Sequence, residues 1–228
     1  IIYSTLIAFV SFTAFAQEKT IKKGNKEYDK YAYFEAKDIY EKVANKGHKS
    51  VDLFQKLGDS YYFNADLPTA NKWYTELFAM NETVDSEYLY RYAQTLKATG
   101  DIKKSDDYLQ KFATAKPQDT RATKFVSSKD YMDVIKANSG RHNIENAGIN
   151  SKAMDFGAAF YKDQLVFTSA RDTSGSRIHS WTNQGFTTLY GSEVKEDGSL
   201  SAPEKFSKSI STKVNESTPV FTSDGNSM

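Results

Sequence analysis

Few side chains in this sequence are of a type and spacing that could do chemistry. The chain has no cysteine, which excludes disulfides, thiolate metal ligands and a cysteine nucleophile. Three histidines (His48, His142 and His179) remain as imidazole ligands, but His142 and His179 share no helical spacing with each other or with acidic residues, so we interpret them as surface residues. No G-x-S-x-G, P-loop, H-E-x-x-H or G-x-G-x-x-G pattern occurs. We therefore predict a protein that is not an enzyme and has no cofactor.

Acidic residues in the second half could hold a cation in principle. Glu145, Asp155 and Asp172 could contribute to a loop site, because carboxylate oxygens are the ligands that calcium prefers. Their spacing does not match that of an EF-hand loop. We therefore predict no metal site.

The overall composition is that of a protein with packed cores. The 228 residues include 30 Lys+Arg and 29 Asp+Glu, so the chain offers no basic field for nucleic acid. An aromatic content of 14% is too high for intrinsic disorder.

The first 16 residues contain no charged residue and end in Ala14-Phe15-Ala16, a small-x-small site before polar chain. This pattern predicts a signal peptide over residues 1–16, and the stretch is shorter than the roughly 20 residues of a membrane-spanning helix. A buried apolar helix is the alternative. Because Gln17 stands where a lipoprotein would carry cysteine, we predict a mature chain that is secreted across the inner membrane and free in the periplasm. The sequence has no initiator Met, and Met228 falls inside an apolar pattern, so we expect a piece of a longer protein.

Residues 18–117 contain a repeated pattern. Small residues recur 34 and then 35 residues apart at positions 24, 58 and 93, and a second set recurs at Ala36, Ala70 and Ser105. Tyr33, Leu67 and Ile102 form a further set, as do Tyr40, Tyr74 and Leu109. The pattern resembles the tetratricopeptide (TPR) repeat, a pair of antiparallel helices.

The TPR resemblance gives each residue type a role. The small residues lie where the two helices of a repeat come closest, and the larger ones fill the space between adjacent repeats. Asp66 and Asp101 are placed to cap the second helices of their repeats. Residues 118–137, with Phe125, Met132, Val134 and Ile135, are expected to form a capping helix. We predict a TPR domain of three repeats and a cap over residues 17–137.

Three repeats make a short arc, and first-helix residues would line its concave face. Their mixture of aromatic and amide side chains suits the binding of a peptide, although some rings could instead pack against the cap or the next domain. By register, the candidate contacts are Asn25, Tyr28, Asp29, Gln55, Asp59, Tyr62, Phe63, Tyr90, Gln94 and Lys97.

From about residue 138 the helical period ends, and Gly, Ser, Thr and Asn become frequent. Short apolar or alternating runs separated by turn residues predict strands and hairpins. The expected strands are Gly157 to Tyr161, Leu165 to Ser169, Thr188 to Val194 and Pro219 to Thr222, and turns are expected at Lys162-Asp163, Glu196-Asp197-Gly198 and Asp224-Gly225. We place a domain boundary near residues 137 to 145.

Two segments about 60 residues apart, 156–172 and 216–228, echo each other. Both resemble the start of a TolB-related, WD-like propeller blade, with a Ser-x-Asp-Gly turn and an apolar strand ending in Phe-x-Ser-x-Arg. This resemblance explains Asp163, Arg171 and Asp172 as turn and strand-end hydrogen-bonding residues rather than acid or ion-binding groups. Because a propeller needs at least about four blades of roughly 40 residues, residues 138–228 hold only the start of one, and the last strand should leave an open edge.

The predicted fold class is therefore an α + β multidomain chain: an N-terminal TPR α-solenoid followed by the first part of a β-propeller. This order resembles the N-terminal part of Bacteroidota OmpA-family proteins. That resemblance implies a non-catalytic, outer-membrane-associated scaffold that binds envelope proteins, notably outer-membrane proteins, and is linked to type IX secretion or gliding motility. Peptidoglycan would be bound only by an OmpA-like domain absent from this sequence.

Two other functions stay open at this stage. The propeller could gate a prolyl-oligopeptidase-like hydrolase lying after Met228, which a downstream Ser nucleophile motif would support. The chain could also be a free periplasmic protein that binds peptides or glycans, which ligand-induced stabilisation of residues 18–137 would support.

Overall fold

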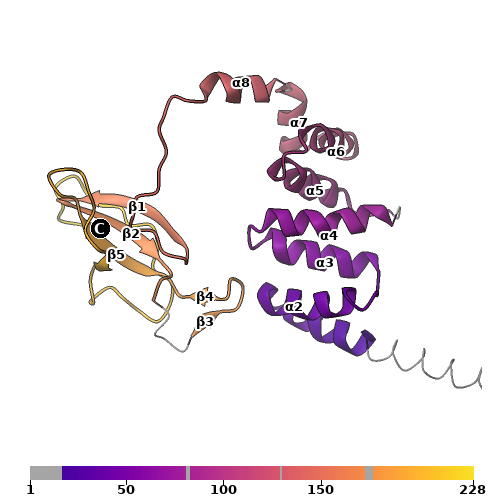
Figure 1. Cartoon of the computed structure of the whole chain (residues 1–228), viewed down its shortest axis with the longest axis horizontal. Helices are drawn as coiled ribbons and strands as arrows, with labels where there is room; N and C mark the ends of the chain where they lie inside the picture. The colour runs from indigo at the N-terminus through magenta and orange to yellow at the C-terminus, as the bar shows by residue number, and fades with distance from the viewer. Residues whose placement is uncertain (1–16, 81–82, 129, 173–176) are drawn as a thin grey trace, which may run out of the picture. The chain divides into compact units, whose positions relative to one another are not determined.

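The computed structural model describes residues 17–80, 83–128, 130–172 and 177–228, so the predicted signal peptide lies outside it. The chain divides into two compact units, a helical unit that ends at Ser139 and a strand unit that begins at Gly140 (Figure 1). In the part described, no helix has the length and apolar character needed to cross a membrane.

The helical unit is a series of helix hairpins (Figure 1). Residues 17–28 and α2 form the first hairpin, α3 and α4 the second, and α5 and α6 the third. Each hairpin also packs against the next. The helices after residue 28 are α2 (Tyr33–Ala44), α3 (Val51–Tyr62), α4 (Leu67–Ala79), α5 (Ser86–Ala98), α6 (Ile102–Ala115), α7 (Thr120–Ser127) and α8 (Tyr131–Asn138).

The turn inside each hairpin has the same backbone form. Tyr31, Ala65 and Gly100, the equivalent positions of the three repeats, have φ of 61°, 59° and 89°. This left-handed residue ends the first helix and lets the next backbone N–H reach back to a carbonyl of its last turn. The predicted caps are confirmed, because Asp66 accepts from the Thr69 N–H and Asp101 from the Lys104 N–H.

The small residues of the repeat permit close contact between the helices of a hairpin, as predicted. A Cβ atom added to Gly58 would lie 2.3 Å from Cε1 of Tyr74, and one added to Gly24 would lie 2.6 Å from Cε1 of Tyr40. In the third hairpin, Ser105 Oγ donates to the Ala93 carbonyl at 2.8 Å. In the first two hairpins the glycine therefore makes room for a tyrosine ring of the helix opposite, and in the third a side chain donates a hydrogen bond to the backbone of the helix opposite.

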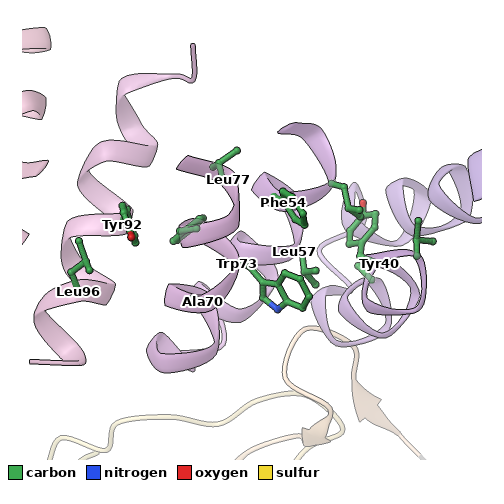
Figure 2. Close-up of a cluster of buried hydrophobic side chains, with 12 residues drawn as sticks. Tyr40, Phe54, Leu57, Ala70, Trp73, Leu77, Tyr92 and Leu96 are labelled. Atoms are coloured by element: carbon green, nitrogen blue, oxygen red, sulfur yellow. The ribbon is translucent and has the colours of Figure 1, made fainter. Parts of the chain in front are cut away.

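One buried cluster runs through all three hairpins (Figure 2). It contains Tyr40 from the first hairpin, Phe54, Leu57, Trp73 and Leu77 from the second, and Tyr92 and Leu96 from the third. Because the cluster is continuous, no hairpin buries its apolar face alone, as expected for stacked repeats.

The second-helix tyrosines do more than fill the space between repeats, the role predicted for them. The rings of Tyr40 and Tyr74 each lie against the glycine of their own hairpin. Tyr74 also contacts the next repeat as predicted, because its ring centroid lies 6.0 Å from that of Tyr88. Tyr33 contacts the second repeat as predicted, and its ring stacks on Phe63 with centroids 5.2 Å apart. The glycine at the helix crossing leaves a space that the tyrosine of the same hairpin fills.

The single capping helix predicted over residues 118–137 was wrong. The structure has two short helices, α7 and α8. Helix α7 packs along α6, whereas α8 contacts α6 and α5 through Tyr131, whose hydroxyl donates to Asp106 and whose ring lies against Lys97. Phe125 of α7 contacts a small core with Phe112 and Ala122, whereas Val134 and Ile135 of α8 are more than half exposed. The break follows a run of polar residues, Ser127 to Asp130, which favour caps and turns over helix interiors.

The strand unit contains a four-stranded antiparallel sheet in the order β1-β2-β5-β6, with β3 and β4 paired separately. The bounds are β1 (Asp155–Tyr161), β2 (Gln164–Ser169), β3 (Ile178–His179), β4 (Gln184–Gly185), β5 (Thr188–Glu193) and β6 (Glu204–Lys205). The first three predicted strands are thus confirmed as β1, β2 and β5, and turns occur at Lys162-Asp163 and Asp197-Gly198 as expected. In β1 the register shifts around Gly157, whose φ of 63° is typical of a bulge.

The fourth predicted strand, Pro219 to Thr222, is not formed. This segment has irregular backbone, and it packs against the sheet through Phe221, whose ring lies 4.5 Å from that of Tyr161, and through the Thr218 N–H, which donates to Thr168 Oγ1. The Asp224-Gly225 turn does form, with Asp224 accepting from the Asn226 N–H. The expected open edge at this strand is therefore wrong as well, and β1 is an outer strand of the sheet.

The architecture is thus a TPR-like series of helix hairpins followed by antiparallel sheet, both in one chain. The repeat period, the helix hairpins and the α + β class agree with the predictions made from the sequence. Assignment of the sheet to a propeller stays a prediction.

Candidate protein-binding face

The candidate site is the face of the helical unit formed by residues 17–28, α3, α5 and α7, here called the first-helix face. At its centre lies Asp59 of α3, which is only 1% exposed. Its Oδ2 accepts from the hydroxyls of Tyr28 at 2.9 Å and Tyr88 at 3.0 Å. Its Oδ1 accepts from the Tyr74 hydroxyl at 2.7 Å and from Arg91 Nη1 at 2.6 Å. Asp59 therefore joins all three repeats.

The buried carboxylate also fixes the protonation of its neighbours. Burial, together with the negative charge of Asp59, raises the pKa of the Tyr28, Tyr74 and Tyr88 hydroxyls above the ordinary value for tyrosine. Burial opposes the charge on Arg91, but the Asp59 carboxylate outweighs it and raises the pKa of the guanidinium. All four groups are hydrogen-bond donors at neutral pH.

Arg91 lies among aromatic rings on this face. Its guanidinium carbon is 4.9 Å from the ring centroid of Phe63, 5.4 Å from Tyr88 and 5.9 Å from Tyr62. The Arg91 side chain keeps 19% of its surface exposed. The cation is thus held in place by its ion pair and rings while part of it faces outward.

The charged network continues from Arg91 to α7. Arg91 Nε lies 3.6 Å from Oε1 of Glu87, and Glu87 receives two hydrogen bonds from Arg121, at 2.9 and 2.8 Å. Arg121 also pairs with Asp119, and its guanidinium carbon lies 4.4 Å from the ring centroid of Tyr90. Hydrogen bonds from Arg121 lower the pKa of Asp119 to about 2. Alternating charges therefore run from Asp59 in the second repeat to α7.

The structure brings five of the ten predicted contacts together at this network: Tyr28, Asp59, Tyr62, Phe63 and Tyr90. Asn25 instead accepts from the Tyr40 hydroxyl inside the first hairpin. Lys97 lies against the ring of Tyr131 in α8. Asp29 is exposed, and Gln55 and Gln94 are half-buried.

Sequence reasoning missed the cations of the network, Arg91 and Arg121, and the acid Glu87 between them. A local signal existed for one contact, because Glu87 and Arg91 are four residues apart on one helix. The pairing of Asp59 with Arg91 spans 32 residues and depends on the stacking of two hairpins. No local pattern encodes that contact.

Two candidate acids of the strand unit, Asp155 and Asp172, are engaged in ion pairs, whereas Glu145 and Asp163 are exposed. Asp155 pairs with Arg171 at 2.9 Å, and Asp172 pairs with Lys205 at 2.5 Å. Burial opposes ionisation of Asp155, but hydrogen bonds from Ser169, Ser151 and Arg171 outweigh it and lower its pKa to about 2. Among the described residues, no three His, Cys, Asp or Glu side chains lie close enough together to hold a metal ion.

The histidines were predicted to be surface residues. His142 is exposed. His179 is half-buried, with its ring against Phe186, so it is less exposed than expected.

No protein-family model and no curated protein shows significant similarity to the chain. One similar solved structure is the first TPR domain of Spaghetti (RPAP3) bound to the HSP90 peptide SRMEEVD. It is 17% identical, and the alignment covers 53% of this chain and 91% of that one with a TM-score of 0.40. At this distance the likeness supports no conclusion about the partners of this chain.

Proposed function

We propose that the chain is a non-catalytic adaptor that binds a protein partner on the first-helix face. The observation that carries the proposal is the position of Arg91, held between Asp59 and the rings of Tyr62 and Phe63 with part of its side chain exposed. Arginine and tyrosine are enriched at the energetic centres of protein interfaces. The charged side chains of this face are already paired and held in place, so binding a partner costs little conformational entropy for ordering them.

The partner that fits this face is an extended segment of another protein. Tyr62 and Tyr90 are half-buried rings on neighbouring repeats, able to contact apolar side chains, and Gln55 and Gln94 could donate to and accept from a peptide backbone. The charges of Arg91 and Arg121 are balanced by acids, so the face favours neither a strongly acidic nor a strongly basic segment.

The compartment and the wider setting are part of the same proposal. The uncharged residues 1–16 and the small-x-small site support secretion into the periplasm. The order of TPR-like repeats and antiparallel sheet supports a Bacteroidota OmpA-type scaffold, in which the sheet would begin a propeller and the partners would be outer-membrane proteins of type IX secretion or gliding. Sequencing the amino terminus of the mature protein tests the secretion step, and Gln17 is the expected first residue.

Site-specific photo-crosslinking tests the binding face. A photoreactive residue replaces Tyr62 in one variant and Gln110, an exposed residue of α6, in a matched control. We expect a discrete crosslinked product with an envelope protein at position 62, and none at position 110. The same product at both positions, or none at either, would contradict the proposal.

A further inference from the structure

The strand unit has a polar hollow of about 420 Å³ over one face of strands β2, β5 and β6. Its lining includes Gln164 of β2, Gly191 and Glu193 of β5, and Glu204 of β6. In the register of the sheet, Gln164 lies opposite Glu193, and Gly191 lies opposite Glu204. Because opposed residues share a face, as do residues two apart on one strand, all four lie on the same face of the sheet. The volume of the hollow is in the range of small-molecule sites.

Gly191 leaves the middle of this hollow open. A Cβ atom added there would lie 3.0 Å from Oε1 of Gln164 and 3.5 Å from Cδ2 of Phe206, so a side chain would fill the space between the amide and the ring. Phe206 also lines the hollow. Its ring is held by those of Tyr161 and Phe221, whose centroids lie 5.7 and 5.9 Å away. The hollow thus combines an amide, two acids and a fixed aromatic ring around an open centre.

The two acids of the hollow have no counter-ion in the described part of the chain. Glu193 and Glu204 are both exposed, and no ion pair joins either of them to a cation among the described residues. Lys205 also lines the hollow, but its ammonium pairs with Asp172. Glu193 and Glu204 are diagonal neighbours on the sheet, a spacing of about 7–8 Å, so their carboxylates repel each other. A cation between them removes this repulsion.

We propose that the hollow binds an organic cation, the ammonium or guanidinium group of a lysine or arginine side chain or of a free amine. The two carboxylates form strong charge-assisted hydrogen bonds with such groups, the Gln164 carbonyl accepts from them, and the face of the Phe206 ring attracts a cation. A metal ion fits less well, because calcium takes about six to eight oxygen ligands and no third acid or histidine of the described chain joins these two. The site belongs to the strand unit and does not depend on the first-helix face.

NMR titration of the whole chain tests the proposal. The signals followed are the backbone amide of Gly191 and the side-chain amide of Gln164, which report on the hollow itself. The cationic probes are butylammonium, methylguanidinium and N-acetyl-lysine methylamide. Butanol, methyl glucoside and calcium chloride serve as the neutral, sugar and metal probes.

Two variants remove the features that the proposal uses. The test variant carries Glu193→Gln and Glu204→Gln, and a second variant, Gly191→Ala, fills the open centre. The matched control carries Glu35→Gln and Glu145→Gln, which remove the same charge from exposed residues outside the hollow. The same spectra show whether each variant is folded.

We expect the three cations to shift both signals in the wild-type chain and in the control. They should bind the test variant and Gly191→Ala about tenfold or more weakly, since these lose the charge-assisted hydrogen bonds or the space for the ligand. Tighter binding of the lysine derivative than of butylammonium would indicate a side chain of another protein as the source of the cation, and the reverse would indicate a free amine. Both orders support the site.

Four results would overturn the proposal. Equal shifts with butanol would show that the hollow does not recognise charge. Shifts with methyl glucoside or calcium, but not with the cations, would show a different ligand. Equal weakening in the test and control variants would show a general charge effect. The fourth is the absence of any shift with the cations.

Discussion

Replacing Asp59 with Asn tests whether the buried carboxylate holds the repeats together. The change keeps the shape of the side chain but removes its charge. An amide oxygen can still accept from Tyr74 and Arg91, and the amide NH2 would face the hydroxyls of Tyr28 and Tyr88. Arg91 would lose the anion that lies 2.6 Å away and keep only Glu87 at 3.6 Å.

The expected loss is about 3 kcal/mol in the free energy of unfolding. Removing one partner of a buried ion pair costs about 3–5 kcal/mol, and the partial exposure of Arg91 favours the low end. Urea denaturation followed by helical circular dichroism measures it. Asp52→Asn is the matched control, because Asp52 forms an exposed pair with Lys56 and should contribute at most about 0.5 kcal/mol. A loss below about 1 kcal/mol for Asp59→Asn would refute the reasoning.

Three further changes have predictable effects on stability. Gly58→Ala should cost about 2 kcal/mol in urea denaturation, because the new Cβ would lie 2.3 Å from the Tyr74 ring; an unchanged midpoint would contradict the packing described. Positions 65 and 100 both have positive φ, which glycine adopts more readily than alanine. Ala65→Gly should therefore raise the thermal midpoint and Gly100→Ala should lower it, with a change of about 1 kcal/mol or less in the free energy of unfolding for each. Shifts of the same sign would be inconsistent with this account. Asp155→Asn should flatten the acid dependence of stability. The folded pKa of Asp155, about 2, lies below its unfolded value, so its contribution of about 2 kcal/mol is present above pH 4 and lost as the pH falls towards 2. Parallel wild-type and variant curves between pH 5 and 2 would rule out that role.

The parts of the fold that sequence reasoning could predict are those encoded by neighbouring residues. Gly58 identifies a helix crossing, and Asp66 identifies a helix start, because each has a steric or hydrogen-bonding role that few residue types can fill. Strands β1, β2 and β5 follow from runs of apolar and β-branched residues between turn residues.

The parts that could not be predicted depend on distant contacts. Residues 219–222 have the composition of a strand, but no neighbouring strand pairs with them in the described chain, and Phe221 is held by the rings of Tyr161 and Phe206 instead. The apolar residues of α8 suggested a cap, yet Val134 and Ile135 stay exposed, and α8 contacts α5 and α6 through Tyr131 instead. In the candidate site, residue register indicated the correct helices, but the pairing of Asp59 with Arg91 arises only when two repeats stack.

The central claim is that a protein partner binds the first-helix face. The most direct measurement is the affinity of the crosslinked partner segment for three forms of the chain, by calorimetry: wild type, Tyr62→Ala and Gln110→Ala. The account predicts a loss of tenfold or more for Tyr62→Ala, which corresponds to about 1.4 kcal/mol or more, and no change for Gln110→Ala. Equal affinity in all three forms would contradict it.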